Sequence, residues 1–254
     1  MKRMIIIIIF LLMLQIVAVS ALTSTDAKKD WIDAKKVSQE KRDAHQEAKL
    51  VWAGDKTPEN DQAVVGTGKE VLHAALDEAE AWLIWKRTEA EKNPFDVDQD
   101  IVDQILNDVD SNLGKIDGLR EDVDGVTNRL ELGLVFLKMV GKYGELLTDV
   151  ARDSGNVWVW VGNEKADKID EYEQKLRDAA DGNDDVLAKL DDARDELDSA
   201  RANIDKAESV YKQVVIPGTP LIKFQEGNQY LRAARANLIN AHRHLDMAYR
   251  ELAR

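Results

Sequence analysis

The sequence predicts an all-α protein, an elongated antiparallel helical bundle or coiled coil of about five long helices. Only four prolines occur in the 254 residues, and each lies at a break between helical segments. Between the breaks, apolar residues recur at alternating intervals of three and four, the spacing of a heptad seam. Apart from residues 154–165, no segment between the breaks alternates like a β-strand for long enough to compete with this pattern.

Proline, glycine and capping residues divide the chain into these helices. Thr57-Pro58 indicates an N-cap followed by proline at the first helical position, and Asn93-Pro94 ends that segment. Ser154-Gly155-Asn156 predicts a turn, and so does the segment between Pro217 and Pro220. We therefore expect helices near 24–53, 57–93, 97–153, 156–215 and 220–254.

The heptad seam of the fourth helix predicts that it passes through Asp181-Gly182-Asn183 without a reversal, because the frame keeps its phase there. Helices of nearly 60 residues are about 85–90 Å long, so the third and fourth are expected to form an extended antiparallel hairpin. The seam of the fourth helix comprises Ile169, Tyr172, Leu176, Ala179, Val186, Leu190, Ala193, Leu197, Ala200, Ile204, Ala207, Tyr211 and Val214.

Residues 1–21 have the pattern of an export signal. Lys2 and Arg3 precede a long apolar run, and Ala21 ends a group of small residues of the kind that signal peptidase recognises. We expect cleavage after Ala21, which leaves 22–254 as a single elongated helical-bundle domain outside the cell or at its surface. The alternative is an uncleaved anchor, since a run of about 18 apolar residues can just span a bilayer.

The composition excludes several classes of function. There is no Cys, which excludes thiol catalysis and Cys-ligated zinc or iron–sulfur sites. The net charge is −13, and an acidic surface repels nucleic acid, so we expect no nucleic-acid partner.

No motif in the chain predicts an enzyme, a cofactor or a metal site. Glu70 and His73 form one Glu-x-x-His pair, whereas ferritin-like metal sites need two such pairs and further Glu residues. Asp96, Asp98 and Asp100 begin like a calcium loop, but the sixth position, which must be Gly, is Ile101. We therefore expect no catalytic, cofactor-binding or metal-binding residues.

The apolar stretch 130–161 is expected to form the tip of the long hairpin, beyond the reach of the second and fifth helices. It carries two apolar seams, and a helix with two seams needs neighbours on two sides. We expect the fourth helix to cover the seam of Leu130, Leu134, Leu137 and Val140. The second seam lacks a neighbour; the first helix, a second copy of the protein or a membrane could cover it. That seam comprises Leu132, Val135, Phe136, Met139, Tyr143 and Leu146.

Five bulky side chains at this predicted tip are the candidate contact residues for a partner or a membrane: Phe136, Met139, Tyr143, Trp158 and Trp160. Trp158 and Trp160 are two positions apart, so they cannot face the same neighbour on a helix. We expect Trp158 to face the third helix and Trp160 to make the second contact.

Three short stretches, "DAKKDWIDAKK", "HAALDEAEAWLIWK" and "VVIPGTPLIKF", resemble those of exported helical-bundle proteins of methane-producing archaea. The resemblance covers most of the mature chain and contains no catalytic motif. It implies an archaeal cell-surface or extracellular setting, and it assigns neither an activity nor site residues.

Together these features predict an exported, non-enzymatic interaction or scaffold protein that binds a protein partner or self-associates. The alternative is a membrane-active protein, similar to a pore-forming toxin, that inserts the apolar 130–161 hairpin tip.

Overall fold

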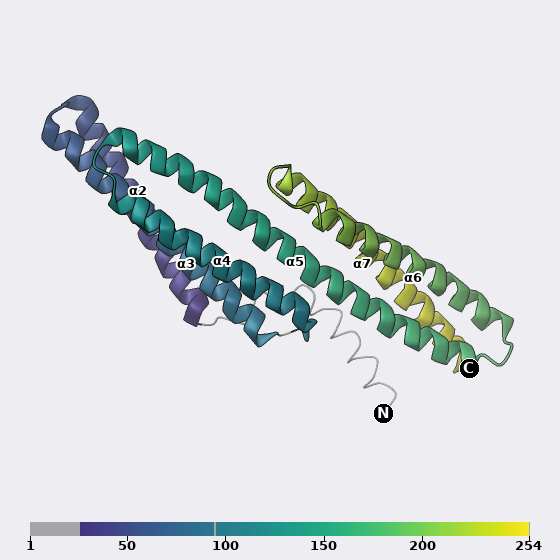
Figure 1. Ribbon diagram of the computed structural model, residues 1–254. Helices are drawn as coiled ribbons and strands as arrows, with labels where there is room; N and C mark the ends of the chain where they lie inside the picture. The colour runs from purple at the N-terminus through teal and green to yellow at the C-terminus, as the bar shows by residue number, and fades with distance from the viewer. Residues whose placement is uncertain (1–25, 94, 254) are drawn as a thin grey trace. The chain divides into compact units, whose positions relative to one another are not determined.

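The computed structural model of the protein describes residues 26–93 and 95–253, and the regular secondary structure of this part of the chain is all α-helix, with short connections between the helices (Figure 1). The prediction of an all-α protein is confirmed. The predicted signal peptide, 1–21, lies outside the described residues. Within them, no helix is long and apolar enough to cross a membrane. The helices are α2 (Asp26–Gly54), α3 (Pro58–Lys92), α4 (Gln99–Asp124), α5 (Arg129–Ala179), α6 (Asp184–Tyr211) and α7 (Pro220–Leu252).

The predicted boundaries are right for α2, α3 and α7 to within a few residues but wrong in the middle of the chain. The expected third helix, 97–153, is interrupted at 125–128. Asn128 caps α5, because its Oδ1 accepts a hydrogen bond from the Glu131 N–H at 3.0 Å. The Glu131 carboxylate in turn accepts bonds from the Thr127 N–H and hydroxyl, which lower its pKa.

The predicted turn at Ser154-Gly155-Asn156 is also wrong, since α5 runs through it without a break. Gly155 is needed for close packing and not for a turn. A Cβ atom at this position would lie 2.4 Å from the Tyr211 ring. The stretch 130–161 is therefore one continuous helix and not a hairpin tip.

The chain does turn at 180–183, where a single long helix was expected. Asp181 and Gly182 have φ angles of 44° and 81°, the left-handed region that ends helices. Asn183 then caps α6, with its side chain accepting from the Val186 N–H at 3.3 Å. The seam kept its phase because the four-residue turn is about as long as one helical turn.

The described chain divides into two compact units. The first contains residues 26–89 and 113–137. Here α2 folds back along α3: Trp31 stacks on Trp85 with ring centroids 5.1 Å apart, and Lys41 pairs with Glu70 at 2.9 Å. The second unit contains residues 90–112 and 138–253.

In the second unit, α6 and α7 pack on α5 through a seam of small and branched side chains. Tyr211 is fully buried, and its ring is enclosed by Gly155 of α5 and Gly227 of α7, where a Cβ would lie 2.6 Å away or less. The Tyr211 hydroxyl donates to Asn228 Oδ1 at 2.9 Å. Nine positions of the seam predicted for the fourth helix lie in or just after α6 and are buried: Val186, Leu190, Ala193, Leu197, Ala200, Ile204, Ala207, Tyr211 and Val214.

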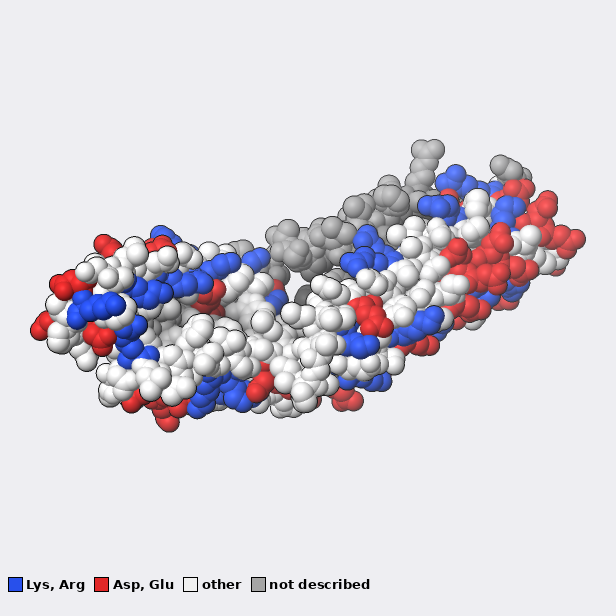
Figure 2. All heavy atoms as spheres, turned by 90° about the horizontal axis from the view of Figure 1, so that it is seen from above, with Lys and Arg blue, Asp and Glu red and all other residues white. Residues whose placement is uncertain are grey.

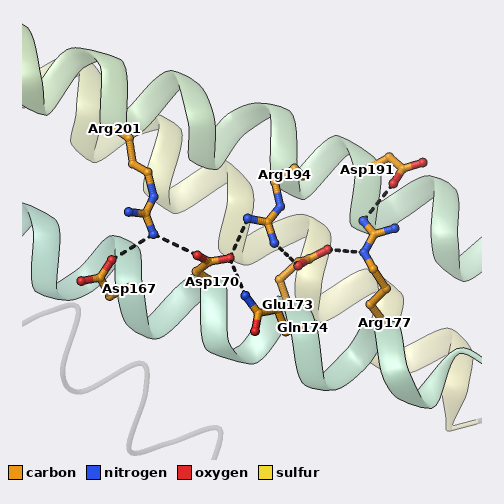
Figure 3. Close-up of polar contacts among 8 residues, drawn as sticks. All are labelled: Asp167, Asp170, Glu173, Gln174, Arg177, Asp191, Arg194 and Arg201. Carbon is orange, nitrogen blue, oxygen red and sulfur yellow. Dashed lines mark hydrogen bonds and ion pairs between the residues drawn. The ribbon is translucent and has the colours of Figure 1, made fainter.

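A row of ion pairs joins α5 to α6 beside this seam (Figure 3). The Glu173 carboxylate is 1% exposed and lies between two guanidinium groups, those of Arg177, at 2.7 Å, and Arg194. Asp170 accepts from Arg194 at 2.6 Å and from Arg201 at 3.0 Å. Because the two carboxylates share three arginines, the charges are neutralised within the protein.

Candidate partner-binding surface

The N-terminal third of α5 has one covered apolar face and one bare apolar face. On the covered face, Met139 and Leu146 are 3% and 5% exposed. On the other face, five large apolar side chains follow one another along the helix with exposed fractions between 49% and 75%. They are Leu130 (75%), Leu134 (59%), Leu137 (66%), Val140 (54%) and Leu147 (49%), and we call them the bare face.

The sequence predicted the opposite distribution, with the seam of Leu130, Leu134, Leu137 and Val140 covered. The reason is the identity of the antiparallel neighbour. Since the chain reverses at 125–128, α4 and not the segment after 156 lies along this part of α5. In the second unit, α4 contacts the side of α5 that carries Leu146, as shown by the 3.0 Å bond from Asn112 to Asp149.

The bare face begins where the cover provided by α6 and α7 ends. Along α5, Gly162 lies against Ile204 and Gly155 against Tyr211. Eleven residues further towards the N-terminus, a Cβ on Gly144 would lie 3.7 Å from Ile216 Cδ1, at the end of the α6–α7 hairpin. Helical phasing places Gly144, Leu137 and Leu130 on the same side of α5 as Gly155. The bare face is thus the uncovered continuation of a seam that α6 covers further along.

The segment that connects α6 to α7 adds apolar surface beside Gly144. Four of its large side chains are exposed: Val215 (44%), Ile216 (49%), Leu221 (65%) and Ile222 (62%). We call these four residues the apolar corner. Figure 2 shows areas without charged side chains between the clusters of charged ones on the side that it draws.

The charged residues around this surface pair with one another. Lys142 bonds to Glu145 at 2.8 Å, and Lys223 bonds to Glu226 at 2.8 Å. Such exposed pairs contribute little to stability, but they leave the centre of the surface apolar. Contiguous apolar surface rimmed by polar groups is typical of interaction sites.

The five candidate contact residues are separated by the structure. Phe136 is 53% exposed, and Met139 is buried in the core. Tyr143, Trp158 and Trp160 are half-buried. The Trp158 ring contacts Phe95, with ring centroids 5.8 Å apart, so its neighbour is the segment before α4. Sequence reasoning missed the bare face itself, although a comparison of the lengths of α6 and α5 could have found it once the turns were known.

A buried charge cluster lies on the covered side of α5, against α4. Asp153 is 6% exposed, and its Oδ1 atom lies 3.8 Å from Arg152 Nε without a hydrogen bond. Arg152 instead bonds to Asp108 of α4 at 2.6 Å and to Asp149 at 3.2 Å. Burial, followed by repulsion from Asp108, raises the pKa of Asp153 to about 7.

The Glu-x-x-His pair and the aspartates before α4 make contacts within the chain. No group of three or more His, Asp or Glu residues in the described ranges is arranged to hold a metal ion. Glu70 pairs with Lys41, and His73 Nε2 lies 3.0 Å from Asp124 Oδ1. The Asp98 side chain accepts from the Asp100 N–H at the start of α4, which is a helix-capping role.

Comparisons of the chain with known family models, with curated proteins and with solved structures find no match.

Proposed function

We propose that the protein is an exported, non-enzymatic interaction or scaffold protein that binds a protein partner through the bare face of α5. We also propose that the helices form an elongated antiparallel helical bundle, which presents this surface to the partner. The observation that carries it is the run of five exposed large apolar side chains, Leu130 to Leu147, on one side of a single helix.

The energetic argument follows from the hydrophobic effect. Complete burial of one Leu or Val side chain contributes about 1.5–3 kcal/mol, and these side chains are about half to three-quarters exposed. Burial of all five side chains against a partner would therefore contribute several kcal/mol of favourable binding free energy. Monomeric proteins rarely expose contiguous apolar patches beyond a few hundred Å², and larger ones mark interaction surfaces.

We propose no catalytic role. The two most concentrated groups of ionisable side chains in the described part of the chain are internal. The ion pairs around Glu173 join α5 to α6, and the Asp153 cluster lies between α4 and α5. Carboxylates of both groups pair with arginines of the same chain, whereas the bare face is a run of exposed apolar side chains.

Export and a cell-surface or extracellular location are part of the proposal and rest on the signal-like sequence at 1–21. The alternative, a membrane-active protein, relied on a hairpin tip at 130–161. With α5 unbroken through this stretch, we propose the alternative as peripheral contact of the bare face or the apolar corner with lipid. The experiment below includes lipid for this reason.

A photo-crosslinking amino acid at Leu137 tests the proposal in cells that export the protein. Leu50 of α2 is the matched control, since it is 70% exposed and Leu137 is 66% exposed. We expect discrete crosslinked protein bands from position 137 and none from position 50. Equal crosslinking at both positions would contradict the proposal. Crosslinking of position 137 to lipid, with co-flotation of residues 22–254 with liposomes, would support the membrane alternative instead.

A further inference from the structure

We infer that the partner on the bare face is a second copy of this chain, with the two α5 helices antiparallel about a two-fold axis between residues 138 and 139. This inference rests on the proposed function, because it names the partner of the same surface. It goes beyond that function in fixing the register and direction of the pairing.

The register follows from the heptad positions of the bare side of α5. The a and d positions are Leu130, Gly133, Leu137, Val140, Gly144 and Leu147. An antiparallel pair sets each a residue opposite a d residue. With the axis between 138 and 139, Leu130 meets Leu147, Gly133 meets Gly144, and Leu137 meets Val140 of the second copy. The order of large residues and glycines is the same when it is read from either end. Large side chains therefore meet large ones, and glycine meets glycine.

The two glycine layers place small residues at both ends of the contact, with open space at Gly133 and the Ile216 side chain beside Gly144. A Cβ on Gly133 would meet no atom within 4 Å, and a Cβ on Gly144 would meet only Ile216, at 3.7 Å. Leu137 and Val140 fill the centre between these layers. The register is a property of α5 alone, which is one unbroken helix of 51 residues.

The ends of the helices favour the antiparallel direction over a parallel one. In the antiparallel register, Arg129, the first residue of α5, lies level with Thr148 of the other copy. Thr148 is already buried, so the exposed part of each α5 ends level with the first residue of the other copy's α5. In a parallel pair, both α6–α7 hairpins would occupy the same side of the two helices directly after residue 147. The helices would then have to separate.

The surface available is close to what a stable dimer needs. The five side chains of the bare face are each 49–75% exposed and together offer on the order of 500 Å² per copy. The apolar corner, at 44–65% exposure, adds roughly 400 Å² beside Gly144. A standard stable interface buries about 800 Å² per partner.

The absence of Cys from the sequence permits a direct test of the register. Two single-Cys variants of residues 22–254, Leu130→Cys and Leu147→Cys, are oxidised separately and as a mixture. We expect a disulfide-linked dimer only in the mixture, because positions 130 and 147 of different copies are opposite. Identical positions lie about 25 Å apart along the axis, at 1.5 Å per residue, which is too far for a disulfide. A linked dimer of Leu130→Cys alone would show parallel pairing and overturn the inference.

Light scattering of the reduced protein between about 1 and 100 µM measures the association itself. We expect a dimer mass for the wild type and a dissociation constant raised about 100-fold by Leu137→Glu, because each dimer then buries two carboxylates. Leu50→Glu, at an equally exposed leucine of α2, should leave the dimer mass unchanged. Circular dichroism checks that both variants keep their helical content.

The two proposals can fail separately. A wild-type protein that stays monomeric at 100 µM overturns the dimer, and so does a dimer that Leu137→Glu does not weaken. If position 137 still crosslinks to another protein in cells, the interaction function stands without self-association. If the protein is monomeric and position 137 crosslinks no more than position 50, both proposals are wrong.

Discussion

Replacement of Asp153 by Asn is expected to stabilise the protein at alkaline pH and to remove most of a pH dependence near neutrality. Asp153 is 6% exposed, and its Oδ1 atom has no hydrogen-bond partner. Burial raises the pKa of Asp153 from 3.8 to about 7. Deprotonation at pH 8 therefore places a negative charge in a buried position, where it is poorly solvated. Asn has nearly the same shape and carries no charge at any pH.

The magnitude follows from the difference in pKa. The folded protein holds the Asp153 proton about 3 units more tightly than the unfolded chain, which corresponds to about 4 kcal/mol as an upper value. Because the folded pKa is raised, this stabilisation is complete below about pH 4 and is lost as the pH rises to about 7. We expect Asp153→Asn to be about 2–4 kcal/mol more stable than the wild type at pH 8.5 and within about 1 kcal/mol of it at pH 4.

Urea unfolding followed by circular dichroism, at half-unit steps between pH 4 and pH 8.5, measures this difference. Asp178→Asn is the matched control, since Asp178 is an exposed aspartate of the same helix. Its effect should stay within about 0.5 kcal/mol at every pH. A stability difference for Asp153→Asn that does not change with pH, or a less stable variant at pH 8.5, would refute the reasoning.

Three further substitutions test the packing of α5 and α6, each by urea unfolding. Gly155→Ala should cost about 1–3 kcal/mol, because its Cβ would lie 2.4 Å from the Tyr211 ring. Gly118→Ala, at a helical glycine with open space around it, should stabilise by about 0.5–1 kcal/mol; equal effects would contradict the packing argument. Tyr211→Phe should cost about 1 kcal/mol through the lost bond to Asn228, and an unchanged stability would show that this bond contributes nothing. Glu173→Ala should cost about 2–3 kcal/mol, less than for fully buried partners since both arginines are about one-third exposed; a loss below 0.5 kcal/mol would contradict its structural role.

The helical class and the buried side of α6 could be predicted from the sequence, because both depend on local periodicity. Leu190, Leu197 and Ile204 are fully buried, as the seam required. Periodicity reports which side of a helix is apolar, whatever the path of the chain. It therefore failed to reveal the turn at Gly182, because the turn leaves the spacing of the apolar residues along the sequence unchanged.

The turns were harder to predict because glycine has two uses. Gly155 allows a close approach to Tyr211 inside a helix, whereas Gly182 adopts a left-handed conformation in a real turn. The sequence around the two residues does not separate these roles. The start of α5 did carry a usable signal, the Asn128-x-x-Glu131 capping pattern, which follows Gly125 by three residues.

The candidate site could be predicted as a region but not as a face. The stretch around Leu137 was recognised as having more apolar surface than one neighbour can cover. Which side stays bare depends on where the α6–α7 hairpin ends relative to α5, near Gly144. The position of this end depends on the tertiary structure. It can be predicted only after the turns at 125–128 and 180–183 are known.

The ion pairs between α5 and α6 have a consequence for how the two helices find their alignment. The apolar seam nearly repeats every seven residues, so a slide by one heptad would replace leucine by leucine and alanine by alanine. The arginines do not permit this. A slide in one direction would bring Glu208 to the place of Arg201, against the carboxylates of α5; the opposite slide would set Leu187 in place of Arg194 beside the enclosed Glu173. The apolar seam would stabilise several registers of the helix pair, and the ion pairs select one of them.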